Sequence, residues 1–234
     1  MKKLSCESIN NFLDKTVSVV NPGVSYGYTP DAPYKGDIVI PETVTFENEV
    51  YRINRISDYA FYCCYGLTSI TLSDSITEIG YMAFRDCVKL SSIVLPKKLT
   101  YLSTYVFFGC TLKELYFKNS CTTCDELGGS INYIYVPQKS YYENTWLSKN
   151  YSDHIIEYVS FDQNEFDYNG QTPTIPYTNN LANKYELTMD VSELPKDAGT
   201  HETSFKAVYS NGLEVDIPYT YTINKVPLTI KVND

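Results

Sequence analysis

The cysteines and histidines are the residues of this chain best suited to chemistry. Cys121-Thr122-Thr123-Cys124 has the two-residue spacing of a zinc ligand pair or a redox pair. A structural zinc ion takes four ligands, and only the adjacent Cys63-Cys64, bending round, would complete the set. Zinc ligands, a local disulfide and plain thiols all stay open for Cys121 and Cys124, and we favour plain thiols.

The two histidines, His154 and His201, lie outside any motif that pairs them with a serine or cysteine nucleophile. Asp162 and Asn164 lie in an acidic segment, but Phe166 occupies a position where a calcium loop needs an oxygen ligand. The glycines are typical of turns rather than of a phosphate-binding loop. We therefore predict no catalytic, metal-binding or cofactor-binding residues, and we expect that the chain is not an enzyme.

Composition narrows the classes of partner. The net charge of −9 argues against the basic surface that nucleic acids and anionic membranes attract. No apolar run approaches the roughly 18 residues of a membrane span, so we expect no membrane insertion. The N-terminus lacks the apolar stretch of an export signal, so an exported form is expected to have lost its signal. The 23 tyrosines fit either a binding surface or many half-buried strand positions, and composition leaves both open.

A repeat of 23 residues organises the first part of the chain. It places two apolar residues, a small residue, a phenylalanine and a cysteine in three successive copies: Ile53, Ile76 and Leu99; Ile56, Ile79 and Leu102; Ala60, Ala83 and Val106; Phe61, Phe84 and Phe107; Cys64, Cys87 and Cys110. One copy cannot bury its apolar face alone, whereas stacked copies share a core. The spacing therefore predicts a solenoid with buried phenylalanines and small, buried cysteines.

Each copy is expected to contribute a short strand and a tight turn. Apolar-x-apolar segments such as Ile93-Val94-Leu95 fit strands, and Ala-Phe-x-x-Cys fits a helical turn on the opposite side. Ile38-Val39-Ile40-Pro41 and Ile134-Tyr135-Val136-Pro137 resemble the strand segment and would extend the concave sheet to about five strands. Residues before 37 and from 138 to 154 are expected to be caps.

From about residue 155 the pattern changes to short alternating stretches, the last of them Leu228 to Val232. Turn signals such as Asn169-Gly170 and Asn211-Gly212 separate these stretches. Six or seven short strands in about 80 residues are typical of a β-sandwich.

Two family resemblances fit these patterns. Ile79-Gly80-x-x-Ala83-Phe84-x-x-Cys87-x-x-Leu90-x-x-Ile93-x-Leu95-Pro96 resembles the BspA-like leucine-rich-repeat family of bacterial surface proteins. The second half resembles MBG-type immunoglobulin-like bacterial domains through Tyr168-Asn169-Gly170, Asp197-Ala198-Gly199-Thr200 and Tyr219-Thr220-Tyr221-Thr222-Ile223.

Together the patterns and resemblances predict a mainly β chain with short helical turns. We expect a short leucine-rich-repeat solenoid with N- and C-terminal caps in residues 1–154 and an immunoglobulin-like β-sandwich in residues 155–234. The resemblances imply an extracellular place on the bacterial cell surface and a role in adhesion or protein interaction. They bring no catalytic residues.

The concave sheet supplies the candidate binding site. Side chains alternate between the two faces of each strand, so one set points away from the core. This set changes from a small, hydroxyl-rich end to an aromatic end: Asp37 and Val39, Ser69 and Thr71, Ser92 and Val94, Glu114 and Tyr116, Tyr133 and Tyr135. We predict that Glu114, Tyr116, Tyr133 and Tyr135 form the binding surface, with exposed rings. Two other interpretations stay open: these are ordinary surface residues, or the second domain packs over the tyrosines.

The leading hypothesis is a non-catalytic cell-surface adhesion or protein-interaction module, with the solenoid as the binding part and the sandwich as a spacer. Its partner would be a protein or glycan on host or neighbouring cells. The alternative is a carbohydrate-binding module of a glycan-handling surface protein, because sugar rings pack on aromatic faces.

Overall fold

The computed structural model describes residues 8–11, 14–21, 34–119, 123–142, 145–191 and 194–225. The chain divides into two compact units, residues 1–156 and 157–234. The described residues are mainly strand, with one short helix, α1 (Trp146–Tyr151), and two 3-10 turns, η1 (Lys139–Tyr142) and η2 (Ser152–His154). The prediction of a mainly β chain is therefore confirmed. Most of the expected N-terminal cap lies outside the described residues.

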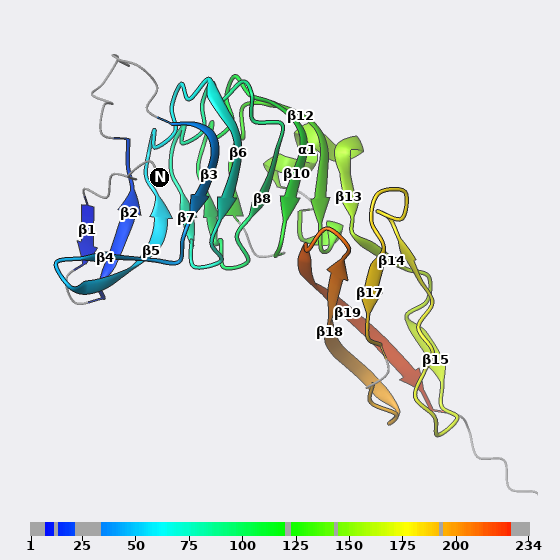
Figure 1. Cartoon of the computed structure of the whole chain (residues 1–234). Helices are drawn as coiled ribbons and strands as arrows, with labels where there is room; N and C mark the ends of the chain where they lie inside the picture. Colours follow the sequence, from blue (N-terminus) through cyan, green and yellow to red (C-terminus); the bar gives the residue numbers. More distant parts are fainter. Residues whose placement is uncertain are drawn as a thin grey trace, which may run out of the picture. The chain divides into compact units, whose positions relative to one another are not determined.

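Parallel strands form one side of unit 1 (Figure 1). β3 (Lys35–Ile40) pairs with β6 (Gly66–Leu72), and β8 (Ser92–Leu95), β10 (Thr111–Phe117) and β12 (Ser130–Val136) pair in that order. These are the five strands that the spacing predicts, and β13 (Ile155–Glu157) adds another next to β12. In β6 and β8 the Leu and Ile side chains are buried and the residues between them point outward, as a half-buried strand requires.

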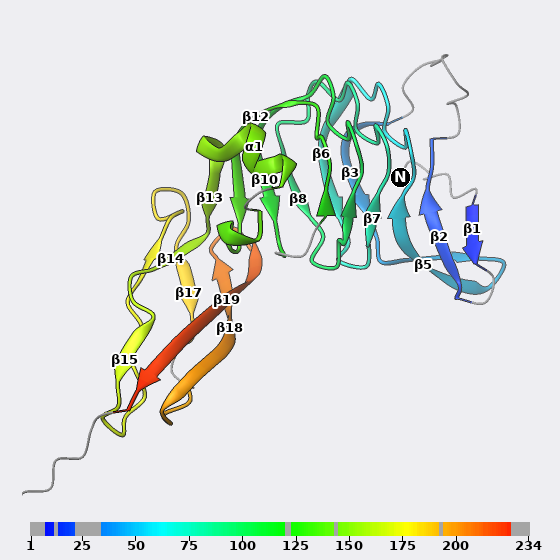
Figure 2. The ribbon, with the colours of Figure 1, turned by 180° about the vertical axis from the view of Figure 1, so that it is seen from behind.

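A second parallel sheet, which the sequence analysis did not predict, forms another side of unit 1 (Figure 2). It runs through β5 (Glu49–Ile56), β7 (Glu78–Ile79), β9 (Tyr101–Leu102) and β11 (Thr123–Cys124). β1 (Ser8–Asn11), β2 (Thr16–Val19) and β4 (Thr43–Phe46) complete it at one end. The signal was a polar-apolar pair repeated every 23 residues: Arg55-Ile56, Glu78-Ile79 and Tyr101-Leu102.

The Ala-Phe-x-x-Cys segments are not helical, so that expectation is wrong. Two residues at the first segment have left-handed backbones: Tyr59 (φ 58°), directly before Ala60, and Cys63 (φ 53°). The same positions are left-handed in the next coils, at Met82, Asp86, Tyr105 and Gly109. Alternate N–H groups therefore point to the next coil: Phe61 donates to the Ala83 carbonyl at 2.7 Å, and Cys63 donates to that of Arg85 at 2.8 Å. Bonds between coils replace the bonds within a helix.

An aromatic column forms the centre of unit 1. The Phe61 and Phe84 rings stack with centroids 5.1 Å apart, and the Phe84 and Phe107 rings follow at 5.8 Å. Tyr34 closes one end, with its ring 5.2 Å from that of Phe61. All three phenylalanines are fully buried, as the repeat predicts.

The repeat cysteines lie beside this column and are buried free thiols. The Cys87 thiol donates to the Phe61 carbonyl at 3.1 Å, and the Cys110 thiol donates to the Phe84 carbonyl at 3.0 Å. Cys87 and Cys110 are thus small fillers that each also tie their own coil to the preceding one.

Unit 2 contains two described sheets. β14 (Val159–Phe161) pairs with β16 (Tyr177–Asn179), and the larger sheet has the order β15 (Glu165–Asp167), β19 (Glu214–Asn224), β18 (Gly199–Tyr209), β17 (Leu187–Met189). A hydrophobic core cluster of unit 2 contains these buried side chains: Ile175, Leu194, Phe205, Tyr219, Tyr221 and Ile223. The expected strand from Leu228 to Val232 lies outside the described residues.

Replacing Phe84 by alanine tests the aromatic column. Because this ring is buried between two others, we expect Phe84→Ala to lower the free energy of unfolding by about 3–5 kcal/mol. Val88→Ala in the same coil is the control, since Val88 is 54% exposed and should cost under about 1 kcal/mol. Denaturant titration measures both, and similar losses in the two variants would show that the interior is misassigned.

The repeat thiols should react with a thiol reagent only after unfolding. Burial raises the pKa of Cys64 to about 11 and that of Cys110 to about 12, from an ordinary value of 9.0, and it also raises the pKa of Cys87. Because the folded protein favours the neutral thiols, these cysteines contribute their full stability below pH 9. That contribution is lost as pH rises through 11 and 12, where the buried thiols must ionise. Site-resolved mass spectrometry measures the labelling, and rapid modification of all three thiols in the folded protein at pH 8 would contradict this assignment.

Candidate functional site

The register of the parallel strands places the predicted outward residues in two rows. Tyr133 pairs with Glu114, which pairs with Ser92. Tyr135, Tyr116 and Val94 form the second row in the same order: Tyr135 with Tyr116, and Tyr116 with Val94. At the other end of the sheet Asp37 pairs with Ser69, and Val39 pairs with Thr71. The stacking order predicted from the spacing is therefore confirmed within β3–β6 and within β8–β10–β12.

The hydroxyl-rich end of these rows is exposed and already hydrogen bonded. The Asp37 carboxylate accepts hydrogen bonds from the Ser69 hydroxyl at 2.6 Å and the Thr68 hydroxyl at 2.9 Å. These two bonds stabilise the charged form and lower the pKa of Asp37. Val39 beside them is exposed. This end therefore offers a fixed negative charge with an apolar neighbour.

The tyrosine end is a stacked aromatic group on top of the sheet. The Tyr116 and Tyr135 rings lie 4.8 Å apart and nearly parallel, and the Tyr133 ring lies 6.4 Å from that of Tyr135. The Tyr116 hydroxyl donates a 2.8 Å hydrogen bond to the Glu114 carboxylate. The four predicted site residues are thus brought together, and the hydrogen bond orients Glu114.

Exposure differs sharply among the three tyrosines. Tyr133 is 48% exposed, whereas Tyr116 and Tyr135 are only 4% and 3% exposed. The expectation that all three rings are open is therefore wrong for Tyr116 and Tyr135. Neither ring belongs to the repeat core, and their mutual stacking covers one face of each. Tyr133, with Glu114 next to it, is the accessible part of the candidate site.

The sequence analysis missed a group of aromatic side chains around the turn segments. Tyr62, Arg85 and Phe108 occupy one repeat position at a spacing of 23, and this spacing was the available signal. The Arg85 guanidinium lies 5.5 Å from the centroid of the Tyr62 ring and 4.9 Å from that of Phe108. It also pairs with Asp86 at 3.2 Å. Because the cation contacts rings on both neighbouring coils, it stabilises the stack of coils.

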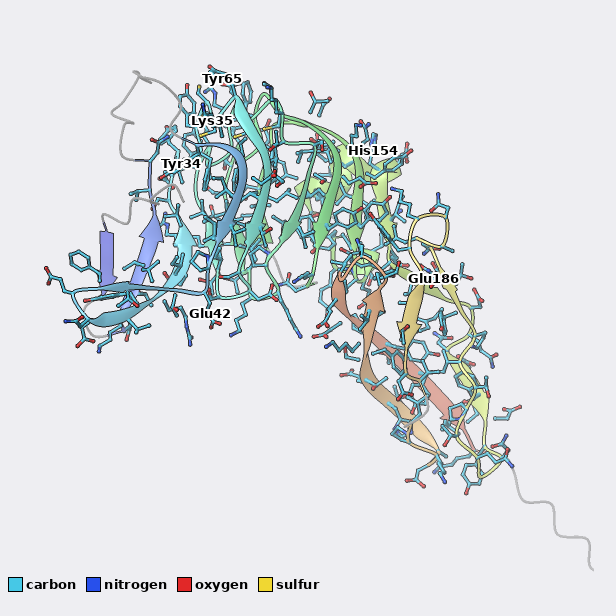
Figure 3. All side chains as sticks on the ribbon, viewed as in Figure 1. Tyr34, Lys35, Glu42, Tyr65, His154 and Glu186 are labelled. Atoms are coloured by element: carbon cyan, nitrogen blue, oxygen red, sulfur yellow. The ribbon has the colours of Figure 1, made fainter. Side chains whose placement is uncertain are left out.

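The histidines have structural partners in separate units. His154, labelled in Figure 3, lies in unit 1 with its Nδ1 2.8 Å from the Asn132 carbonyl. His201 Nε2 lies 2.8 Å from the Asp197 carbonyl in unit 2. Neither contact forms a nucleophile-base pair. Cys121 lies outside the described residues, and only the backbone of Cys124 is described.

The described residues contain neither a cluster of metal ligands nor a membrane-spanning helix. Within these ranges no three His, Cys, Asp or Glu side chains gather in a way that could hold a metal ion. The helices of the same ranges are too short to cross a membrane.

The repeated region matches a known family of repeats. Residues 40–128 match the family model described as "BspA type Leucine rich repeat region", in six copies. No curated protein matched the chain.

Two solved structures are similar to part of the chain. A leucine-rich repeat protein from Bacteroides capillosus ATCC 29799 is 25% identical with a TM-score of 0.42, over 53% of this chain and 89% of that one. A leucine rich cell surface protein from Faecalibacterium prausnitzii A2-165 is 23% identical with a TM-score of 0.33, over 56% of this chain and 31% of that one. By the family match, residues 40–128 are similar to BspA-type leucine-rich repeat regions.

Proposed function

We propose that the chain is a non-catalytic protein-interaction module of a bacterial cell surface, with a role in adhesion. In this proposal residues 1–154 are a BspA-like leucine-rich-repeat solenoid with caps, and residues 155–234 are an MBG-type, immunoglobulin-like spacer. The match of residues 40–128 to a repeat family of this kind supports protein interaction. The partner is a protein on a host or neighbouring cell.

The aromatic end of the parallel sheet is the proposed binding site. The observation that carries this assignment is the exposed Tyr133 ring beside the stacked pair of Tyr116 and Tyr135. A tyrosine held on a rigid sheet loses little entropy when it is buried by a partner, and tyrosine is frequent among binding hot spots. Glu114 lies in register with Tyr133 and supplies an acceptor at the rim.

The neighbouring positions suit the periphery of such an interface. Ser92 continues the row of Tyr133 and Glu114, and Ser69 and Asp37 occupy the corresponding positions on β6 and β3. These side chains are small and polar, so they let a partner approach closely and form hydrogen bonds around an aromatic centre.

Carbohydrate binding at the same face is the second candidate. The half-exposed Tyr133 ring favours it, because an aromatic face packs against a sugar ring. The burial of Tyr116 and Tyr135 leaves one accessible platform instead of three, and this favours a protein ligand.

A single substitution separates these cases. Tyr133→Ala should weaken binding to the responding protein by about 30-fold, the effect of removing a hot spot of about 2 kcal/mol, while the melting temperature stays within a few degrees. Tyr141→Ala is the control, because this tyrosine is also about half exposed but lies in η1, outside the strands of the sheet. The measurement is biolayer interferometry against panels of purified extracellular matrix proteins and of glycans.

Two outcomes test the candidates, and a triple variant tests the buried rings. Unchanged protein binding by a folded Tyr133→Ala variant would place the site elsewhere. A response confined to the glycan panel and lost in Tyr133→Ala would favour the carbohydrate candidate. The triple change of Tyr116, Tyr133 and Tyr135 to alanine should lower stability by at least about 3 kcal/mol, because two of its rings are buried.

A further inference from the structure

A polar cavity of about 250 Å³ lies in unit 2, apart from the repeats. β15 and the last residues of β19 form one wall, and the loop of residues 168–174 forms the other. Figure 1 shows β15 beside the end of β19. The cavity is smaller than the roughly 300–1,000 Å³ typical of drug-sized ligand sites, so it suits a ligand of about one ring.

Hydrogen bonds hold parts of both walls in place. β15 pairs with β19, with Phe166 opposite Ile223, and the Tyr168 N–H donates to the Asn224 carbonyl at 3.0 Å. In the loop, the Gln171 N–H donates to the Asn169 side chain at 2.9 Å, which fixes the turn. These bonds fix β15, the end of β19 and the Asn169–Gln171 turn before a ligand binds, which lowers the entropic cost of binding there.

The side chains that line the cavity favour an uncharged ligand rich in hydroxyl groups. Gln171 carries an amide, and Thr172 and Thr174 carry hydroxyls, all of which donate and accept hydrogen bonds. The Gln163 amide nitrogen donates to the Glu165 carbonyl at 2.6 Å, and its amide oxygen is a further acceptor group. Asp167 adds a carboxylate acceptor. Such a set matches hydroxyl groups, which also donate and accept.

The charges of the lining side chains argue against anionic ligands and against calcium. Among the described residues that line the cavity there is no lysine or arginine, and Asp167 would repel a phosphate or carboxylate ligand. One carboxylate is also a poor ligand set for calcium, which takes six to eight oxygens. The Phe166 ring, which contacts Tyr221 edge-on, adds an apolar element suited to the C–H groups of a ring.

We propose that this cavity binds one uncharged sugar residue of a glycan. Asp167 and Gln171 hydrogen bond its hydroxyl groups, and Phe166 contacts its apolar edge. The site would give the second unit a binding role of its own, independent of the Tyr133 surface in unit 1.

Titration of the full chain with monosaccharides, followed by amide NMR, tests this proposal. The probes are glucose, galactose, mannose and N-acetylglucosamine, with glucuronate as the anionic counterpart of glucose. We expect saturable shifts in residues 163–174 with at least one neutral sugar. Glucuronate should bind more weakly than glucose, because Asp167 repels its carboxylate.

Variants show whether the cavity side chains make the contacts. Asp167→Ala and Gln171→Ala, at two exposed positions, should each weaken binding about fivefold or more, the effect of losing one hydrogen bond. Asn183→Ala, an exposed amide outside the cavity, should bind within about twofold of the unaltered chain. The proposal is overturned if no neutral sugar gives saturable shifts, if glucuronate binds as tightly as the neutral sugar that binds best, or if both cavity variants bind like the unaltered chain.

Discussion

The rings of Tyr34, Phe61, Phe84 and Phe107 form a stack in the core of unit 1. This stack sets the spacing between neighbouring coils, because each ring must contact the ring of the next coil. Backbone bonds from each turn segment to the next coil hold the same spacing from outside the core. These bonds require left-handed residues such as Cys63 and Asp86, and a left-handed backbone costs about 1–2 kcal/mol at each non-glycine position. The ring contacts and the bonds between coils offset that cost.

The same constraint produces the candidate binding surface. Once the coils are in register, equivalent strand positions form rows, and the tyrosines at the end of two rows stack on the sheet. The third copy is one residue shorter after Cys110, yet Leu115 still pairs with Ile93. Side-chain type, rather than residue count, therefore sets the register, because a slip of one residue would turn the apolar set outward.

The tyrosines serve two purposes, in the core and on the surface, and each unit contains both kinds, which explains why composition alone left two interpretations open. In unit 2, Tyr219 and Tyr221 stack at 5.6 Å within the core, and burial raises the pKa of Tyr219 to about 12. Tyr65, Tyr133 and Tyr141 in unit 1 are about half exposed. A tyrosine fits both settings because its ring is apolar and its hydroxyl reaches water or a backbone acceptor.

The sequence by itself determined the parallel stacking, the buried phenylalanines and cysteines, and the rows that contain Glu114 and Tyr133. These follow from the 23-residue spacing, because a repeated position meets its own copies in the neighbouring coils. Only the tertiary structure decided the second sheet, the left-handed turns, the burial of Tyr116 and Tyr135, and the cavity beside β15. The second sheet and the left-handed turns follow the same 23-residue spacing, but a two-residue strand or a turn has too short a pattern to be recognised without the backbone geometry. The burial of Tyr116 and Tyr135 and the cavity depend on contacts that no short sequence pattern relates.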